Sequence, residues 1–470
     1  MAASYAFSWR ERLGLCAAAL STLVVQLDWL AVNLALPQIA HDFSQSATNL
    51  QWVLTAFMLA FGGLLPIAGR FTDAYGRRRM TIYGMGVFMV SSGICAAAPN
   101  VAWLVIGRAL QGAGGAFVVP GSVAMIAGVF EGRRKNIGMG FVMGASGAGA
   151  ALGPFIGGLL AEFDWRYVFL INLPIGLIAI PLIYWCVRPS YDPVAAALKS
   201  PWLSAGAVVL GFVGITLAVD RGSTWGWASS LTLLCAGGGA LLLVVFALNE
   251  SKGSHPLHDR SFYADRVVQL LTATGALSVI GYAILSTFSV IYLQEDQGLL
   301  PLTAGCIFLA LSIPDAASSY VAGKVAASAY RYVYLCAAMG LAAFGILLVT
   351  WAESLGLYVV AFMLCGLGIG LTGGLTNVLT QHRVSPEKAG AAVSLSLAAK
   401  MLASAIALAL AATGLETLNG GVPGAVSNTG ALEAILRATA LMMGLGFLLL
   451  VPRATRAVRV SVSHDGAPRD

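Results

Sequence analysis

The sequence contains few charged residues. Asp, Glu, Lys and Arg make up only 10% of its 470 residues, while 58% of the residues are hydrophobic. An ordinary soluble domain has about 25% charged residues, so this composition excludes a single large soluble core. A span of the hydrocarbon layer needs about 20 mainly apolar residues, and the chain is long enough for about a dozen of them. The composition therefore predicts an all-α polytopic membrane protein.

Motifs of several enzyme classes are also missing. The chain has no HExxH zinc motif, no GxSxG nucleophile motif and no glycine-rich phosphate loop that ends in Gly-Lys-Ser or Gly-Lys-Thr. These absences argue against membrane proteolysis and against ATP-driven transport within the chain. We therefore expect a protein that is not an enzyme and that uses no cofactor or metal.

Paired cysteine spacings are absent as well. Each cysteine lies inside or at the edge of an apolar run, with no spacing typical of zinc ligands or of a disulfide framework. We interpret them as small side chains that face lipid or the protein core. The seven are Cys16, Cys95, Cys186, Cys235, Cys306, Cys336 and Cys365.

The charge that is present is mainly positive and lies between apolar runs. The formal net charge is +6, which in a soluble protein would suggest a nucleic-acid partner. Here the basic stretch Gly69–Arg79, GRFTDAYGRRR, joins two apolar runs, and Lys and Arg are retained on the cytoplasmic side of membranes. We therefore interpret the excess as membrane topology, expect no nucleic-acid partner, and place this loop in the cytoplasm.

Fourteen apolar runs predict fourteen transmembrane helices. Because the number is even, both termini fall on the cytoplasmic side with the loop 69–79. The loops on the other side carry only Arg166 and Arg221, which agrees with this orientation. The runs cover about 13–37, 51–69, 80–98, 101–129, 137–161, 166–187, 203–220, 230–249, 267–293, 302–325, 332–351, 356–380, 389–414 and 432–452.

Two long cytoplasmic loops divide these spans into two bundles and an insert. We predict an N-terminal six-helix bundle over 1–188, a linker with two extra helices over 189–263, a C-terminal six-helix bundle over 264–453 and a cytoplasmic tail over 454–470. A weak repeat supports the two halves, because Gly323-Lys324 resembles Gly69-Arg70. Parallel six-helix repeats are a known plan of transporters.

Two ionisable residues are predicted at the same depth on separate spans. Asp28 and Arg108 each lie about seven or eight residues, or roughly 12 Å, from the outer end of their span. Pairing would lower the cost of burying each charge. Protonation of the acid would free the arginine, which keeps its own proton. We therefore predict a proton-coupling pair, with a purely structural ion pair as the alternative. Gln111 shares the face of Arg108 and is predicted to line a cavity.

Other polar and aromatic residues are predicted to face a substrate cavity. Asp315 and Lys400 lie near the middle of their spans, where they either pair or both face water. Asp315 would hold a cationic substrate or a second proton, and Lys400 either has a structural role or favours an anionic group. Trp29, Asn33 and Tyr282 are further candidates, although most aromatic residues in membrane spans serve packing.

The fifth span carries a stripe of small residues. Gly149, Gly153 and Gly157 recur at four-residue spacing, with Pro154 and Gly158 beside them. Such a stripe allows close helix packing, and the proline weakens one helical turn. On its own, a small-residue stripe predicts packing.

These stretches together resemble the major facilitator superfamily, and within it the fourteen-helix branch of drug:proton antiporters. The resemblance covers nearly the whole chain. Its residues are Gly69, Asp73, Gly76, Arg77 and Arg78 in the loop motif; Asp28, Asn33 and Pro37 in the first helix; Arg108, Gln111 and Gly112 in the fourth; Gly149, Gly153, Pro154, Gly157 and Gly158 in the fifth; and Trp165, Arg166, Phe169, Asn172, Pro174 and Gly176 beyond it.

The resemblance implies a mechanism. Two six-helix bundles would surround a central cavity that opens alternately to the two sides of the membrane. Protons would be exchanged for a small lipophilic drug or natural product, including cationic ones, with the proton gradient as driving force. Asp28 and Arg108 would carry the coupling, and the motif 69–79 would hold the inner gate shut. We expect a monomer in the plasma (inner) membrane, with the bilayer, protons and a small molecule as its partners.

Three other functions remain open at this point. A proton-coupled symporter for nutrient uptake is disfavoured by the Gly-Pro pattern of the fifth span. An exporter of lipids or lipid-like molecules would need an opening between helices. A transporter-shaped sensor without transport is disfavoured by the intact coupling residues. A flux assay in a pH gradient separates transport from sensing.

Overall fold

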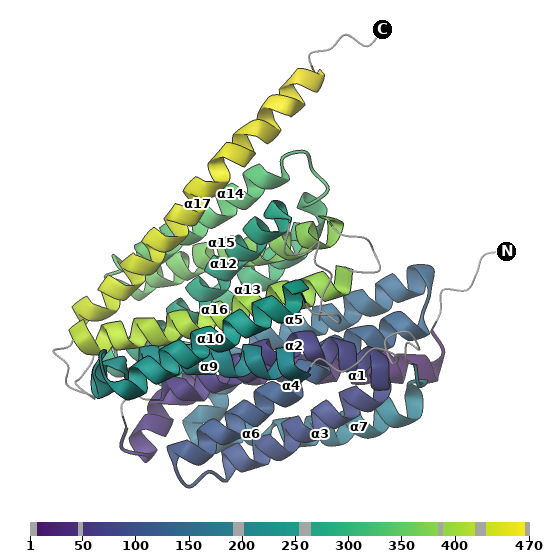
Figure 1. Cartoon of the computed structure of the whole chain (residues 1–470), viewed down its shortest axis with the longest axis horizontal. Coiled ribbons are helices and arrows are strands. Elements are labelled where there is room, and N and C mark those ends of the chain that lie inside the picture. Colours follow the sequence, from purple (N-terminus) through teal and green to yellow (C-terminus); the bar gives the residue numbers. More distant parts are fainter. Residues whose placement is uncertain are drawn as a thin grey trace.

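The computed structural model describes residues 7–45, 50–190, 202–252, 265–383, 389–418 and 429–465. Within these ranges all regular structure is helical, and long helices run side by side (Figure 1). The predicted linker 189–263 and tail 454–470 lie partly outside the described residues. Among the predicted site residues, the side chain of Asp73 lies outside them too.

The helices follow the fourteen predicted apolar runs, and α6 and α7 share the sixth run. Eleven segments of the described chain are long and apolar enough to cross a membrane, and α2 adds a shorter apolar stretch, Gln51–Leu65. The multi-pass helical architecture is thus confirmed, whereas fourteen crossings are not. The helices are α1 (Trp9–Asp42), α2 (Gln51–Tyr75), α3 (Arg77–Ala96), α4 (Val101–Val129), α5 (Gly132–Phe163), α6 (Arg166–Leu170), α7 (Asn172–Cys186), α9 (Trp202–Trp225), α10 (Ser230–Lys252), α12 (Arg266–Ile291), the π-helix η1 (Tyr292–Asp296), α13 (Pro301–Val325), α14 (Arg331–Val349), α15 (Leu355–Arg383), α16 (Ala389–Leu418) and α17 (Thr429–Asp465).

Local chemistry sets several helix boundaries. The hydroxyl of Ser8 accepts from the backbone amide of Glu11 at 3.3 Å, and the Glu11 carboxylate accepts from the amide of Ser8 at 2.8 Å. This reciprocal capping box satisfies two amides that the first turn of α1 leaves free. Between α2 and α3, Gly76 adopts a φ of 104°, a conformation that side chains with a Cβ rarely reach. The predicted loop 69–79 is therefore mostly helical, with its turn at Gly76.

The helices form two bundles with matching internal packing. In the first bundle α1 packs on α5, and α4 packs on α2 and α3. In the second bundle α12 packs on α16, and α15 packs on α13 and α14 in the same way. Two interfaces join the bundles, one between α5 and α13 and the other between α2 and α16. These equivalent pairs give the two bundles the same arrangement of helices.

The two inserted helices lie against one of these interfaces. Helix α9 packs on both α2 and α16, and α10 packs on α9 (Figure 1). The carboxylate of Asp220 in α9 accepts from Gln51 Nε2 at 2.9 Å and from Trp52 Nε1 at 2.5 Å. Both donors belong to the first turn of α2, so polar contacts fasten α9 to the first bundle. From α16, the Thr413 hydroxyl donates to the carbonyl of Val219 in α9 at 3.3 Å.

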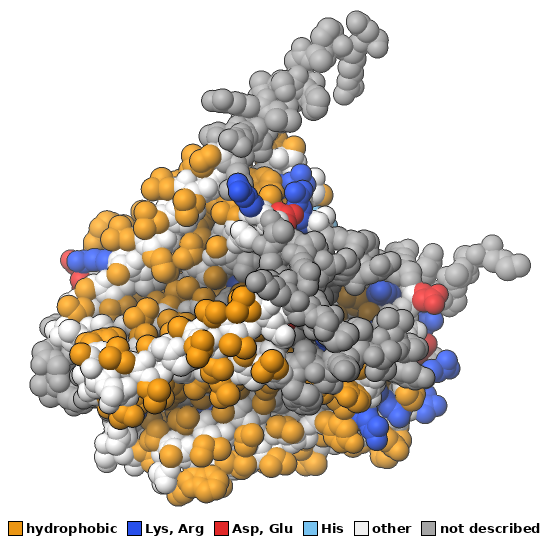
Figure 2. Space-filling view, viewed as in Figure 1, with side chains coloured by type: hydrophobic (Ala, Val, Ile, Leu, Met, Phe, Trp, Pro, Cys, Tyr) orange, Lys and Arg blue, Asp and Glu red, His pale blue; other side chains and the backbone are white. Residues whose placement is uncertain are grey.

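One end of the molecule is rich in basic side chains. Arg77 and Arg331 begin helices there, and Arg383 ends one. Figure 2 shows Lys and Arg side chains gathered near the beginning of the chain and a mainly hydrophobic surface along the helices. We call this end, which includes the motif 69–79, the basic end.

The bundles meet closely away from the basic end. Gln294 Nε2 in η1 donates to the carbonyl of Leu34 in α1 at 3.0 Å. A Cβ at Gly305 in α13 would lie 2.9 Å from the carbonyl oxygen of Pro154 in α5. Nearer the basic end, a Cβ at Gly144 or Gly147 of α5 would meet no described residue within 4 Å. The α5–α13 interface is therefore tight at the opposite end and loosens towards the basic end.

Candidate functional site

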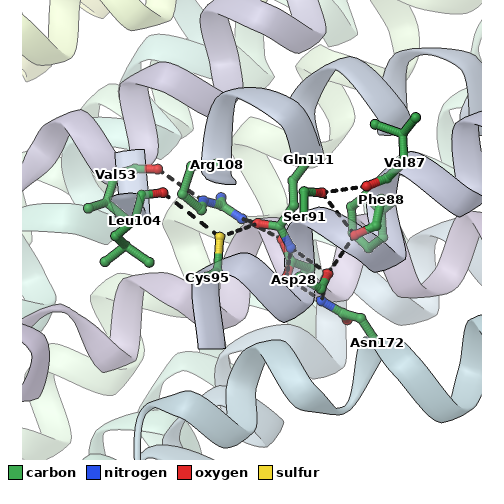
Figure 3. A network of polar contacts seen from close by, with 11 residues as sticks. Asp28, Val53, Val87, Phe88, Ser91, Cys95, Leu104, Arg108, Gln111 and Asn172 are labelled. Carbon is green, nitrogen blue, oxygen red and sulfur yellow. Dashed lines mark hydrogen bonds and ion pairs between the residues drawn. The ribbon is translucent and has the colours of Figure 1, made fainter. Parts of the chain in front are cut away.

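A buried ion pair lies inside the first bundle. Arg108 Nη1 of α4 contacts Asp28 Oδ2 of α1 at 2.5 Å, and both side chains have 0% exposure (Figure 3). The predicted pairing of these two residues is thus confirmed as a contact. Breaking such a pair by removing one partner costs about 3–5 kcal/mol, because the other charge stays buried and uncompensated.

The rest of the guanidinium group is held by α2. Arg108 Nε donates to the backbone carbonyl of Val53 at 3.0 Å, and its Cζ lies 4.5 Å from the ring centre of Phe57. The ring face supplies favourable cation–π contact at this buried site. Arg108 Nη2 is buried without a hydrogen-bond partner among the described residues. The arginine is therefore fixed by its other contacts and is not fully satisfied.

Amide side chains complete the binding of the Asp28 carboxylate. Gln111 Nε2 donates to Asp28 Oδ1 at 3.1 Å, and Asn172 Nδ2 donates to the same oxygen at 2.6 Å. Both amides also donate to the hydroxyl of Ser92 in α3, at 2.7 Å and 3.1 Å respectively. Helices α1, α3, α4 and α7 thus all contribute polar side chains to a single network, with both Arg108 and Gln111 coming from α4 (Figure 3).

Two members of this network were not predicted as site residues. Asn172 entered the sequence analysis only through the family resemblance, and Ser92 did not enter it. The signal for Asn172 was available, because an amide at the start of a strongly apolar helix needs a buried partner. Ser92 gave no comparable signal, since serines inside membrane helices commonly bond to their own backbone.

The glycine stripe of α5 lies directly behind Asp28. A Cβ at Gly153 would lie 2.9 Å from the carbonyl oxygen of Leu27, and a Cβ at Gly149 or Gly157 would overlap the α1 backbone in the same way. Gly158, one residue along, faces the backbone of Pro301 in α13 instead. The stripe therefore lets α1 lie in backbone contact with α5, as its spacing predicted, and Gly158 extends the contact to the second bundle.

A cavity lies on the other face of α1, between the bundles. Its walls come from α1, α2, α12 and α16, and the space between them that is not filled by atoms, open solvent included, is about 240 Å³. Trp29 and Asn33 line it from α1, and Tyr282 and Thr287 line it from α12. Asn33 Oδ1 is buried and has no hydrogen-bond partner in the described part of the chain. Three predicted cavity residues, Trp29, Asn33 and Tyr282, are thus brought together.

The other three predicted cavity residues lie elsewhere. Gln111 does not line this cavity, because its side chain is fully buried in the Asp28 network. Asp315 in α13 is partly exposed, and no described residue gives its carboxylate a hydrogen bond or ion pair. The carboxylate interacts electrostatically with Tyr282, which does line the cavity. Asp315 therefore stands next to the cavity wall rather than in it.

Lys400 is buried inside the second bundle. Its Nζ donates to Asn377 Oδ1 at 2.7 Å and to Thr376 Oγ1 at 3.2 Å, both on α15. A Cβ at Gly275 of α12 would fall on the end of the lysine side chain, so this glycine makes room for it. Lys400 does not pair with Asp315, because α16 directs it between α12 and α15.

The arginine motif binds the end of a helix in its own bundle. Arg78 Nη1 donates to the carbonyls of Tyr184 and Val187 at 3.0 and 3.1 Å, and the amide of Arg77 donates to Ser190 at 2.9 Å. The carbonyls at a helix C-terminus carry partial negative charge, so a guanidinium there is favourable. A Cβ added at Gly69, the first residue of the motif, would lie within 4 Å of no described residue, so close packing does not require a glycine there.

Two helical bundles of equivalent packing, with an interbundle cavity and a buried acid–base pair beside it, are typical of a multi-pass membrane transporter. Residues 18–408 match the sequence model of the Major Facilitator Superfamily, and the chain belongs to this family. It is a transporter of small molecules and not an enzyme.

The relatives include drug-resistance proteins. The chain is 34% identical over 410 residues to the puromycin resistance protein pur8 of Streptomyces alboniger, covering 85% of this chain and 81% of that one. It is 30% identical over 408 residues to the multidrug resistance protein Stp of Mycobacterium tuberculosis, covering 85% and 75%. These matches agree with the drug-efflux branch that the sequence motifs resembled.

Solved structures share the fold at low sequence identity. A bacterial homologue of the human lysosomal transporter Spinster, in an inward-facing and unoccupied conformation, superposes with a TM-score of 0.68 at 15% identity. The superposition covers 97% of this chain and 98% of that one. The human organic anion transporter MFSD10 gives a TM-score of 0.63 at 16% identity, covering 94% and 99%.

Proposed function

We propose that this chain is a proton-coupled antiporter that exports small lipophilic drugs or natural products by alternating access. The observation that carries the proposal is the position of α1 between two sites. One face of α1 presents Asp28 to Arg108, and the other presents Trp29 and Asn33 to the interbundle cavity. A change in the charge of Asp28 therefore acts on the same helix that lines the cavity.

In its present arrangement the Asp28 network favours the ionised carboxylate. Both oxygens face N–H donors, since Oδ2 accepts from Arg108 and Oδ1 from Gln111 and Asn172. A proton on either oxygen would place a donor against a donor and remove the charge that holds Arg108. Protonation would therefore loosen α1 from α4, which supports proton release and substrate loading as mutually exclusive states.

The proposed substrate class rests on the relatives and on the cavity wall. The two relatives described above are a puromycin resistance protein and a multidrug resistance protein. The cavity is lined mainly by apolar and aromatic side chains, with the Asn33 amide and a few hydroxyls as its polar groups. Asp315 beside Tyr282 would favour the cationic members of this class.

The membrane arrangement is part of the proposal. We propose that α2, α3 and α9 cross the bilayer together with the eleven apolar segments, which gives fourteen spans. The basic end then faces the cytoplasm with both termini, and the protein is a monomer of the plasma membrane. The bundles 1–188 and 264–453, the insert 189–263 and the tail 454–470 keep their predicted limits.

The motif 69–79 would act as a latch of the inner gate. In the present structure Arg78 binds the end of α7 within the first bundle, and the α5–α13 interface is loose near this end. We propose that the latch forms across the bundles when the basic end closes, with Asp73 and the arginines bonding to neighbouring helix ends.

Inverted membrane vesicles test the function. A proton gradient is first established, and addition of a lipophilic drug should partly collapse it. Asp28→Asn should abolish this response while the protein still folds, and Asp42→Asn, at a half-exposed ion pair with Arg166, is the matched control. Full proton coupling in the Asp28→Asn variant would refute the role of Asp28. A drug response without any proton movement would refute antiport.

A further inference from the structure

Asn172 has an unused hydrogen-bond acceptor at the centre of the network. Its side chain is fully buried, and its Nδ2 donates to Asp28 at 2.6 Å and to Ser92 at 3.1 Å. Its Oδ1 is buried and has no hydrogen-bond partner among the described residues. The assignment of nitrogen and oxygen is sound here, because only the nitrogen can donate to the carboxylate. A buried acceptor without a partner costs free energy and calls for an explanation.

Gln111 provides a direct contrast in the same network. Its Nε2 also donates to Asp28 and to Ser92, but its Oε1 accepts from Arg108 Nη1 at 2.8 Å. Turning the Gln111 amide over would break the bond to Arg108 and place two donors together. Turning the Asn172 amide over breaks no bond to its oxygen. Of these two amides, only Asn172 is free to exchange its donor for its acceptor.

We propose that the Asn172 amide flips when Asp28 gains a proton, and thereby binds both charge states of the coupling acid. This inference rests on the proposed function, since it assumes that Asp28 takes up protons. In the ionised state Asn172 Nδ2 donates to Asp28 Oδ1, as the structure shows. When a proton binds Oδ1, the new O–H donates to the flipped Asn172 Oδ1, and no other covalent bond changes.

Ser92 can follow this exchange. Its hydroxyl now donates to the carbonyl of Phe88 at 2.8 Å and accepts from Asn172. After the flip, the hydroxyl hydrogen can rotate so that it donates towards the Asn172 oxygen, because a serine hydroxyl both donates and accepts. Arg108 lacks this freedom, since a guanidinium has donors only. Protonation therefore weakens the Arg108 contact and keeps the Asn172 contact.

The surroundings of Asp28 leave few other groups that could compensate. The charged or titratable groups near it in the described chain are Arg108 of α4 and Cys95 of α3. Helix α5 presents glycines to α1, α7 presents Asn172, and α12 presents Tyr282 across the cavity on the opposite face of α1. Asn172 is thus placed to keep α7 attached to α1 throughout the proton cycle, while α4 is released.

The pH dependence of drug-driven proton flux tests the flip. A fixed donor would favour the ionised acid alone, so Asn172→Leu would then raise the half-maximal pH by about one unit or more. An amide that flips stabilises both the ionised and the protonated state of Asp28, so its removal changes the balance between these two states little. Asn172→Leu should therefore shift the half-maximal pH by less than about half a unit and lower the coupled flux by about tenfold or more. Asn172→Thr, whose hydroxyl donates and accepts, should restore most of the flux.

Infrared difference spectra between high and low pH provide a readout that does not depend on transport. The wild-type spectrum should contain a side-chain amide carbonyl band that shifts with the carboxyl band of Asp28 and disappears in Asn172→Leu. If the Asn172→Leu variant is unstable, Asn172→Thr serves as a folded protein that also lacks the amide. A full-unit rise in half-maximal pH, or a spectrum without the amide shift, would overturn the inference. Retained coupling in Asp28→Asn would instead overturn the proposed function.

Discussion

The double variant Asp28→Asn/Arg108→Gln should lose far less unfolding free energy than the sum of the losses in the two single variants. Asp28→Asn leaves a buried guanidinium with the neutral carbonyl oxygens of Val53 and Gln111 and no anion. Arg108→Gln leaves a buried carboxylate with two amide donors. Each single variant should lose about 3–5 kcal/mol of unfolding free energy, because each leaves one uncompensated charge.

The double variant leaves no buried charge. Neutral replacements of buried ion pairs are commonly close to wild type in stability, so we expect a loss of about 2 kcal/mol or less. The sum of the two single losses would be about 6–10 kcal/mol, which gives an interaction energy of at least about 4 kcal/mol. Equilibrium unfolding in mixed detergent micelles, followed by tryptophan fluorescence, measures all four proteins. The double variant should still fail to couple drug and proton movement.

The exposed pair of Arg166 and Asp42 is the internal control. Its atoms lie 3.3 Å apart, but the side chains are 36% and 40% exposed, so its interaction energy should be below about 1 kcal/mol. If the losses at Asp28 and Arg108 simply add to within about 0.5 kcal/mol, the two charges do not stabilise each other and the reasoning fails.

Three further outcomes are expected. Gly157→Val should prevent stable folding or cost several kcal/mol, because its side chain would overlap the α1 backbone, whereas Gly144→Val on the same helix should change thermal stability little; equal losses in both variants would contradict the packing argument. Asp315→Asn should weaken resistance to cationic drugs more than resistance to neutral ones in a growth assay, and equal losses would exclude a charge-reading role. Burial alone would raise the pKa of Asp265, but bonds from Arg383 and two backbone amides lower it below its ordinary value. Stability from the charge of this cap is therefore present above about pH 4 and lost as the pH falls through the lowered pKa, so Asp265→Ala should cost about 1 kcal/mol at neutral pH and less in acid.

The sequence predicted those features that follow from the free-energy cost of burying polar groups in a membrane. Each apolar run forms a helix because an exposed backbone in lipid would lack hydrogen-bond partners. Asp28 and Arg108 could be paired from depth alone, because neither charge is stable in that position without the other. The stripe of α5 could be assigned to packing, since repeated glycines at four-residue spacing permit little else.

The sequence did not predict contacts that depend on how helices are rotated. Gln111 was expected in a cavity, yet its face of α4 turns into the first bundle towards Asp28. Lys400 could have met Asp315 at that depth, but the space left by Gly275 directs it to Asn377 instead. Helical periodicity identifies which residues share a face, whereas the choice of the opposing helix depends on tertiary packing.

The inserted helices make the molecule unequal on its two flanks. On one flank α9 packs over the line where α2 meets α16, and α10 packs outside it. On the other flank, over the residues that the structure describes, neither α9 nor α10 packs extensively on the line where α5 meets α13. Lateral pressure from the surrounding lipid therefore reaches one bundle interface directly and the other only through an intermediate layer. With α9 and α10 in the bilayer as proposed, a change in bilayer thickness or tension should load the two bundle interfaces unequally.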